Sequence, residues 1–228
     1  LMSFVIDPQP QASLPVVGSS QLFPVNRIYC VGRNYAEHAR EMGHDPDRDP
    51  PFFFQKNPAN LDTSGTFPYP VKTEDVHWEI EMVAALKSGG KDIPAATALD
   101  HVFGYGVALD MTRRDLQGVA KKMGRPWEIG KAFDRSAPCT GLVPASQIGH
   151  PAKGAIWLDV NGERRQEGDL AQMIWSIPEQ IAYLSSHFEL LAGDIILTGT
   201  PAGVAACQRG DQFVGHVDGL PELRVTVV

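Results

Sequence analysis

Apolar and polar residues alternate strictly over the short segment His77-Trp78-Glu79-Ile80-Glu81. Strict alternation predicts a β-strand, because successive side chains of a strand point to opposite faces. Apolar residues continue to about residue 87, and a second apolar run follows, so we expect strands over 77–87 and 102–110. The charged residues of the first segment would then share one face of the strand, and its apolar residues the other.

The rest of the pattern consists of short strands separated by turns, with few helices. Asn161-Gly162 lies between two extended segments and is a strong hairpin signal. Ser176 and Glu179 form a capping-box pattern that opens an amphipathic helix to about residue 191. We also expect strands over 27–31, 52–54, 194–197, 212–217 and 223–227, a helix over 35–42, and a helix or ordered loop over 116–123.

These elements predict a mixed-β (α+β) fold with short helices, built as a single domain. The 228 residues contain 22 Gly and 18 Pro, which favours many turns over long helices. Residues 1–26 are rich in Pro and Ser and show no helical period, so we expect an extended arm that packs on the body. Residues 27–228 would form the body of the domain.

Charge and hydropathy exclude several classes of partner. The net charge of −7 argues against nucleic acid or an anionic membrane as the main partner. No apolar run approaches the ~18 residues of a membrane span, and the first residues lack a basic-then-apolar signal, so we expect a cytoplasmic protein. The three cysteines, Cys30, Cys139 and Cys207, have no metal-binding spacing and are expected in the core.

Two carboxylates without a neighbouring cation suggest a metal site. On a strand, Glu79 and Glu81 would lie roughly 6.6 Å apart on one face together with His77. Carboxylates that close together repel one another, and a cation that prefers oxygen ligands, Mg²⁺ or Mn²⁺, relieves the repulsion. The alternative is a solvated acidic face. Asp110 is a structural turn residue unless its strand pairs with the strand of the glutamates, in which case a metal role becomes reasonable.

His38 and Glu41 are candidates for a general base. They stand three residues apart on the helix expected over 35–42, so they share one face. A carboxylate beside an imidazole fixes its tautomer and raises its basicity, and such a pair can activate a water molecule. The alternative is an incidental ion pair on a surface helix.

Two further segments carry candidate chemistry. Lys131 lies among aromatic and small residues, where it is either a partly buried cation that stabilises developing negative charge or a surface lysine with a packed stem. The strand over 194–197 runs into a glycine-rich turn at 199–204, whose backbone N–H groups and Thr200 hydroxyl could hold a carboxylate. The turn lacks the Gly-Lys-Ser/Thr ending of a phosphate-binding loop.

Six short motifs follow one another in a characteristic order. They are Gly32-Arg33-Asn34-Tyr35 with His38 and Glu41, Phe53 with Lys56, Glu79-x-Glu81, Asp110-x-Thr112-x-Arg114-Asp115-Leu116-Gln117, Lys131-x-Phe133-Asp134, and Gly199-Thr200-Pro201-x-Gly203-Val204. Together they resemble the fumarylacetoacetate hydrolase family over residues 27–217. Within this family, the stretch over 52–128 is most similar to bacterial fumarylpyruvate hydrolases.

The resemblance implies a fold, a cofactor and a set of site residues. The fold would be a β-sandwich roll, in a homodimer. A Mg²⁺ or Mn²⁺ ion would be bound by Glu79, Glu81 and Asp110, a water would be activated by His38 and Glu41, and the transition state would be stabilised by Lys131. The substrate pocket would be lined by Arg33, Lys56, Arg114, Gln117 and Thr200. Many relatives have the lysine followed directly by proline, whereas Asn57 stands between Lys56 and Pro58 here.

The implied reaction is hydrolysis of a carbon–carbon bond in a small 2,4-dioxo acid, an acylpyruvate. Fumarylpyruvate would give fumarate and pyruvate, in gentisate-type aromatic catabolism. Its second carboxylate needs a cation, because an unpaired buried carboxylate is costly, and Arg33 and Arg125 are candidates.

Two alternatives stay open. Members of the family also decarboxylate oxaloacetate or isomerise hydroxymuconate-type dienols at the same metal site. A non-catalytic metabolite-binding protein on this fold would be expected to lack the base, a carboxylate or the lysine, and all of these are present.

Overall fold

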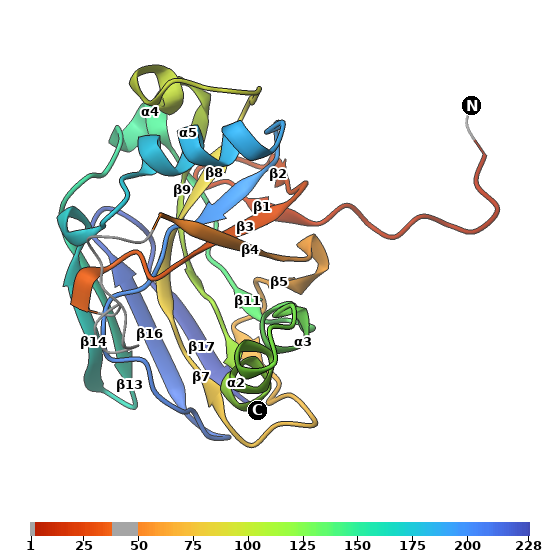
Figure 1. Ribbon diagram of the computed structural model, residues 1–228, viewed down its shortest axis with the longest axis vertical. Helices are drawn as coiled ribbons and strands as arrows, with labels where there is room; N and C mark the ends of the chain where they lie inside the picture. The colour runs from red at the N-terminus through yellow and green to blue at the C-terminus, as the bar shows by residue number, and fades with distance from the viewer. Residues whose placement is uncertain (1–2, 38–49) are drawn as a thin grey trace.

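The computed structural model describes residues 3–37 and 50–228, and two β-sheets form its body (Figure 1). The six-stranded sheet has the order β12 (Val143–Pro144), β9 (Val102–Leu109), β8 (Ile80–Leu86), β15 (Ile195–Leu197), β3 (Ile28–Gly32) and β4 (Phe52–Lys56). The five-stranded sheet has the order β14 (Glu163–Asp169), β13 (Ala155–Val160), β16 (Gln212–Val217), β17 (Leu223–Val227) and β6 (Thr66–Phe67).

The main hydrophobic core includes side chains from both large sheets. Ile80 and Met82 of β8 belong to this core, as does Phe213 of the five-stranded sheet. Val83 and Ala85 belong to a second apolar cluster, so successive residues of β8 serve different clusters. The alternation predicted from the sequence is therefore present, and the predicted fold class, mixed β with short helices in one domain, is confirmed.

The strand predicted over 77–87 is interrupted after its first residue, His77. β7 (Val76–His77) pairs with β10 (Thr112–Arg113), whereas β8 begins at Ile80, opposite Leu109 of β9. The chain changes its pairing partner across Trp78 and Glu79. Alternation along one strand carries no information about its partner, which is why the sequence predicts a continuous element.

The helices are short. They are α2 (Arg114–Lys122), α3 (Glu128–Lys131), α4 (Ala145–Ile148) and α5 (Ile177–His187), with 3₁₀ turns η1 (Pro58–Asn60), η2 (Ala95–His101) and η3 (Leu170–Gln172). The helix expected over 116–123 is confirmed as α2, which begins two residues earlier. Most of the helix expected over 35–42 lies outside the described residues.

The helix predicted to run to residue 191 begins at the expected capping box but ends at His187. Phe188 is extended, with φ of −130° and ψ of 144°. The backbone of Leu190 exchanges two hydrogen bonds with Gly90, at 2.8 and 3.0 Å. Strand-like pairing therefore replaces the last helical turn, although the apolar pattern of the sequence continues through it.

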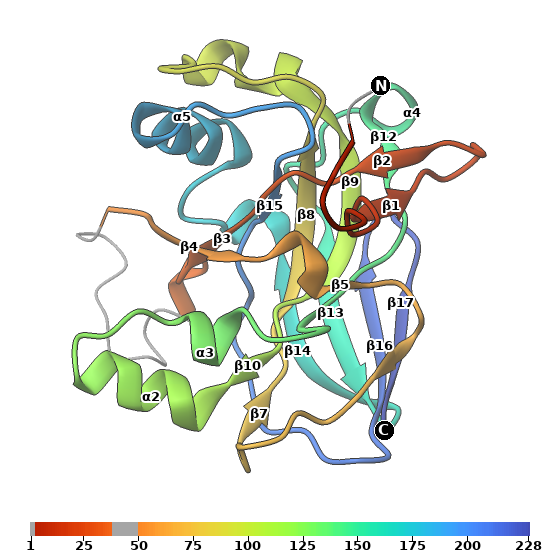
Figure 2. The same ribbon diagram turned by 90° about the vertical axis from the view of Figure 1, so that its right-hand side faces the viewer.

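The segment before residue 27 is partly paired with the body. β1 (Ser13–Pro15) and β2 (Leu22–Pro24) form a hairpin, and Leu14 and Phe23 are buried in the second apolar cluster. Residues 3–10 extend away from the body as a segment without secondary structure (Figure 1). β5 (Leu61–Asp62) and β11 (Ala137–Pro138) form a small parallel pair, and Figure 2 shows β5 below the hairpin. The domain boundary at residue 26 stays a prediction.

The hairpin predicted at Asn161-Gly162 is confirmed as the connection between β13 and β14. Asn161 has φ of 53° and Gly162 has φ of 80°, the left-handed conformation that a two-residue hairpin turn requires. No helix among the described residues combines the length and the apolar character needed to cross a membrane.

Candidate metal centre and active site

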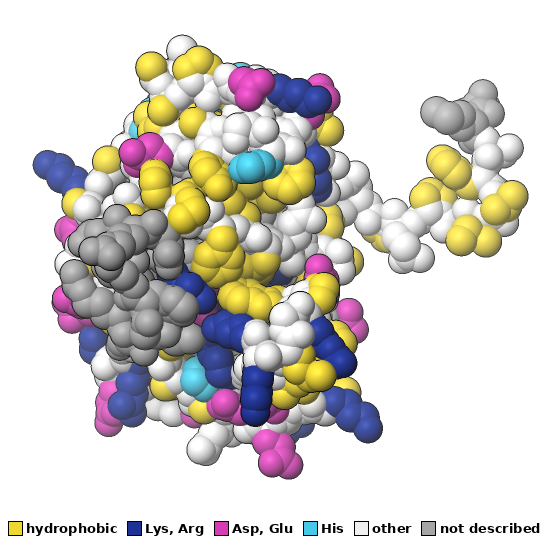
Figure 3. Space-filling model, viewed as in Figure 1, with side chains coloured by type: hydrophobic (Ala, Val, Ile, Leu, Met, Phe, Trp, Pro, Cys, Tyr) yellow, Lys and Arg dark blue, Asp and Glu magenta, His cyan; other side chains and the backbone are white. Residues whose placement is uncertain are grey.

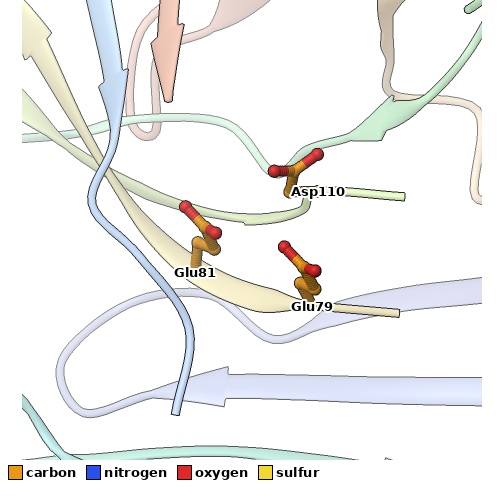
Figure 4. A group of neighbouring side chains, drawn as sticks. All are labelled: Glu79, Glu81 and Asp110. Atoms are coloured by element: carbon orange, nitrogen blue, oxygen red, sulfur yellow. The ribbon is translucent and has the colours of Figure 1, made fainter. Parts of the chain in front are cut away.

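Three buried carboxylates converge where β8 and β9 end (Figure 4). β8 and β9 are antiparallel with Ile80 opposite Leu109, so Glu79 and Asp110 come next in register, and the Asp110 N–H donates to the Glu79 carbonyl at 2.9 Å. Glu81 lies one residue inside β8. One oxygen from each carboxylate lies within 4.8 Å of the other two. The strand pairing on which a metal role of Asp110 depended is therefore present.

The three carboxylates are withdrawn from solvent: Glu79 is 5% exposed, Glu81 1% and Asp110 0%. Burial raises the pKa of Glu81 well above its usual range, and the negative charges of Asp110 and Glu79 act in the same direction. The Gly199 N–H opposes this effect by donating to Glu81 Oε2 at 2.8 Å. Charge concentrated in this way favours a bound cation.

Gly199 opens the glycine-rich turn that was expected to hold a carboxylate. Its φ is 100°, and a Cβ atom at this position would lie 2.5 Å from Cβ of Asn34. Only glycine fits this backbone without displacement. The carboxylate that the Gly199 N–H holds belongs to the protein itself, since it is that of Glu81.

Two cations donate hydrogen bonds to the carboxylates. Lys131 is 2% exposed, and its Nζ donates to Glu79 Oε2 at 2.8 Å and to Asp110 Oδ2 at 2.7 Å. Arg114 Nη2 donates to Glu79 Oε1 at 2.5 Å. Burial lowers the pKa of Lys131, but the attraction of Asp110 and Glu79 outweighs burial and holds this pKa above its usual value. Lys131 is thus a buried ammonium group rather than a surface lysine.

A third cation lies behind the carboxylates. Lys56 is 2% exposed, and its Nζ donates to the carbonyls of Met111 and Lys131 and to Ser136 Oγ. Nζ also lies 2.9 Å from Asp110 Oδ1. Those three hydrogen bonds use the three N–H groups of the ammonium. Asp110 Oδ1 accordingly accepts no hydrogen bond from the described residues, although it is fully buried.

The donor set fits a hard divalent cation. All three groups offer carboxylate oxygen, the ligand type that suits Mg²⁺ and Mn²⁺. Oxygens that share one Mg²⁺ at about 2.1 Å lie at most about 4.2 Å apart, so the span of 4.8 Å needs only a small contraction. Asp110 Oδ1 provides a buried acceptor without a donor. His77 is not part of the group, because its Nε2 contacts Asp75 Oδ1 at 2.8 Å.

A narrow cavity, partly open to solvent, adjoins the carboxylates. It is lined by Val31, Gly32, Arg33, Phe52, Phe54, Glu79, Glu81, Arg114, Gln117, Lys121, Trp127, Lys131 and Thr200. Four of these side chains are cationic and three are aromatic. Basic side chains gather beside hydrophobic ones over α2 and α3 on the face shown in Figure 3. The cavity thus combines a metal-binding group with a positive wall and an aromatic wall.

The structure brings most of the predicted site residues together. Arg33, Arg114, Gln117, Lys131 and Thr200 line the cavity with Glu79 and Glu81. Lys56 is not among the lining residues, because its side chain points behind Asp110. Arg125 is exposed and borders a neighbouring groove, which shares Phe52, Phe54 and Trp127 with the cavity but does not include the carboxylates. The predicted base, His38 with Glu41, lies outside the described residues.

Lys121 and Trp127 line the cavity and were not singled out from the sequence. Arg114, Gln117 and Lys121 are spaced by three and four residues, which places them on one face of α2. The sequence shows this spacing, but the spacing identifies a functional face only once α2 is known to pack beside the cavity. Trp127 precedes α3, and its ring contacts Phe52 and Phe54 with centroids 5.3 and 5.6 Å apart.

The chain belongs to the fumarylacetoacetate hydrolase family: residues 27–228 match the family described as Fumarylacetoacetate (FAA) hydrolase C-terminal. The protein is therefore an enzyme of this family, and the predicted resemblance is confirmed.

The relatives of the chain include fumarylpyruvate hydrolases and oxaloacetate tautomerases. Fumarylpyruvate hydrolase from Pseudomonas aeruginosa, solved in complex with Mn²⁺ and pyruvate, is 55% identical, with 99% of each chain covered and a TM-score of 0.98. Oxaloacetate tautomerase YcgM of Escherichia coli is 42% identical over 86% of this chain and 90% of its own. The mitochondrial oxaloacetate tautomerase of Homo sapiens is 41% identical over 88% of this chain and 90% of its own.

Proposed function

We propose that this protein is a metal-dependent hydrolase that cleaves a carbon–carbon bond in an acylpyruvate, and that its substrate is fumarylpyruvate. The observation that carries the proposal is the pairing of a buried Glu79, Glu81 and Asp110 group with a cavity lined by four cations. A cation-rich cavity suits a substrate with two carboxylates. Likeness to the Pseudomonas enzyme, whose structure holds Mn²⁺ and pyruvate, supports the same assignment.

The three carboxylates would hold Mg²⁺ or Mn²⁺, which supplies Lewis acidity for the oxygens of a 2-oxo acid when it is bound. Arg114 and Lys131 lie beside the carboxylates, where they can bind substrate oxygens that carry negative charge. Gln117 and Thr200 provide neutral polar groups on the same cavity wall. Phe52, Phe54 and Trp127 give the cavity one aromatic wall.

In the proposed reaction, water adds to the acyl carbonyl and the carbon–carbon bond to the pyruvyl methylene breaks. The electron pair of that bond goes to the pyruvate enolate, which is then protonated to pyruvate, and fumarate is the second product. Lys131 would stabilise the negative charge that develops on oxygen. Activation of the water by His38 and Glu41 stays a prediction from the sequence.

A second function is favoured by the curated relatives. Oxaloacetate tautomerases share up to 42% identity with the chain, and oxaloacetate is also an oxo acid with two carboxylates. Tautomerisation moves a proton and needs no attacking water, so it would depend less on His38 and Glu41. Oxaloacetate decarboxylation and hydroxymuconate isomerisation are alternatives at the same site.

The direct test is loss of the ultraviolet enol band with metal-stripped protein titrated with Mg²⁺ or Mn²⁺. The substrates are fumarylpyruvate, acetylpyruvate, fumarylacetoacetate and oxaloacetate, and pyruvate release is assayed in parallel. We expect metal-dependent release of pyruvate, fastest from fumarylpyruvate. Loss of the oxaloacetate enol band without pyruvate release, and no cleavage of the other substrates, would replace the hydrolase by a tautomerase.

We also propose a homodimer. Phe4, Val5 and Ile6 are 67%, 102% and 79% exposed on the extended N-terminal segment, which runs away from the body (Figure 1). Exposed apolar side chains in such a row are typical of a segment that another chain covers. Light scattering after gel filtration tests this, and a monomer at micromolar concentration would contradict it.

A further inference from the structure

Lys121 is a half-buried cation in the cavity, one turn of α2 beyond Gln117 and two turns beyond Arg114. Its Nζ lies 4.9 Å from the centre of the Trp127 ring, which holds the side chain against the aromatic wall. Arg114 contacts Glu79 and so marks the metal-binding end of the cavity. Lys121 lies seven positions further along α2 than Arg114, which corresponds to a rise of about 10 Å along the helix axis.

No carboxylate of the described residues forms an ion pair with Lys121. Within the same part of the chain it has no hydrogen bond either, and its aromatic neighbour is uncharged. Arg114 and Lys131, by contrast, both contact Glu79. A cation that is partly removed from water and has no carboxylate in contact is costly unless a ligand supplies a closer negative charge.

The charges that face Lys121 come from several elements. Arg114 of α2, Arg33 in the loop after β3 and Lys131 of α3 are positive, and Glu79 is the negative group that faces it. Burial lowers the pKa of Lys121, and Arg114 and Arg33 lower it further, to about 8. The ammonium is therefore only partly retained in slightly alkaline solution, and an anion bound beside it would restore its charge.

We propose that Lys121 binds the carboxylate at the far end of a dicarboxylate substrate and thereby selects long diacids over short ones and over monoacids. This inference rests on the proposed function, because it places the oxo-acid end at the metal-binding group. The seven-carbon chain of fumarylpyruvate can extend from that group toward Lys121, whereas four-carbon oxaloacetate is shorter by three carbons. The sequence suggested Arg33 and Arg125 for this role. Arg33 lines the cavity together with Lys121, whereas Arg125 borders the neighbouring groove.

Binding of the two products, fumarate and pyruvate, tests the role of Lys121 independently of turnover. The metal-loaded protein and the variants Lys121→Met, Lys121→Arg and Lys122→Met are titrated calorimetrically with fumarate and with pyruvate. Lys122 is exposed and does not line the cavity, so it is the matched control. We expect Lys121→Met to weaken fumarate binding about 10-fold or more, as for a lost hydrogen bond to a charged group, and to leave pyruvate binding unchanged.

The pH dependence gives a second readout. Fumarate binding to the wild type should weaken as pH rises through about 8, where Lys121 loses its proton. Lys121→Arg should bind fumarate with little change over the same range, because a guanidinium stays charged. Failure of the wild type to bind fumarate, equal losses for fumarate and pyruvate in Lys121→Met, or an unchanged fumarate affinity would each overturn the inference.

The two proposals fail differently. One outcome is that the wild type cleaves no acylpyruvate while Lys121→Met shows a selective loss of fumarate affinity. That result would reject the proposed hydrolase activity and support a dicarboxylate subsite at Lys121. If the wild type cleaves fumarylpyruvate and the preference for it over acetylpyruvate survives in Lys121→Met, the hydrolase stands and Lys121 has no part in selecting the diacid.

Discussion

Lys131 joins two of the three carboxylates, and its replacement by methionine tests the electrostatic description of the centre. The substitution keeps the length of the side chain and removes hydrogen bonds of 2.8 Å to Glu79 and 2.7 Å to Asp110, in a position that is 2% exposed. Removing one partner of a buried ion pair costs about 3–5 kcal/mol, because the remaining charge stays buried.

The lower end of that range applies here. Glu79 keeps its contact with Arg114, and Asp110 keeps Lys56 at 2.9 Å, so neither carboxylate loses its last cation. A loss of about 3 kcal/mol in a domain of this size corresponds to a Tm lower by about 6–12 °C. The assay is a thermal melt of the metal-free protein at pH 7, with Lys91→Met, an exposed lysine, as the control.

Adding Mn²⁺ to the Lys131→Met variant separates stability from catalysis. A bound ion would neutralise the carboxylates that lost their ammonium, so the metal should raise the Tm of the variant more than that of the wild type. Turnover should nevertheless fall by about 10²–10³, as for a lost donor to developing negative charge. A metal-free Tm within about 2 °C of the wild type, at about 2–4 °C per kcal/mol, or turnover near normal, would refute the reasoning.

Three further predictions address the metal, the backbone and the helix α2. Saturating Mn²⁺ should raise the Tm of the wild type, since ligand at 100-fold excess over Kd adds about 2.7 kcal/mol to the free energy of unfolding. Glu81→Ala should abolish this rise in Tm, and an equal rise in the variant would exclude Glu81 as a ligand. Gly199→Ala should lower the free energy of unfolding in urea by about 1–3 kcal/mol, because alanine is strained at φ of 100° and its Cβ would meet Asn34; an unchanged midpoint would contradict this. Lys121→Met should melt higher than the wild type at pH 7, because the native state lowers the pKa of Lys121 from 10.5 to about 8 and so disfavours its charged form. The unfolded chain binds the extra proton between these pKa values, so wild-type stability should rise with pH there and the advantage of the variant should shrink by pH 10.5; a constant difference in Tm would contradict the assignment.

The sequence predicts the strands well where the alternation of apolar and polar residues matches the way the strands pair. Alternation over 77–81 assigns Trp78, Ile80 and Met82 to one face, and all three belong to the core between the sheets. It does not predict that β7 and β8 have different partners, because partner choice depends on segments far away in the chain. The end of α5 at His187 was missed for the same reason, since the hydrogen bonds of Leu190 go to Gly90.

The candidate site was predicted as a set of residues more successfully than as a geometry. Glu79, Glu81 and Asp110 were identified from residue type, order and resemblance, and they meet because β8 and β9 pair in one register. The directions of Lys56 and Arg125 could not be predicted, because each depends on how its segment packs. Lys121 was missed because a lysine on an amphipathic helix is usually a solvated side chain.

Ion pairs, together with the ring of Trp127, attach the segment from α2 to α3 to the body. Its helices bury only Gln117, Gly130 and Lys131, while Val119 and Ile129 are more than half exposed. The ion pairs that hold it end on Glu79 and Asp110, the same groups that would bind the metal. Ordering of residues 114–131 and metal loading are consequently linked equilibria, and each must change the other by the same factor. Amide hydrogen exchange over this segment should therefore report metal occupancy, even though no helical residue there is proposed as a ligand.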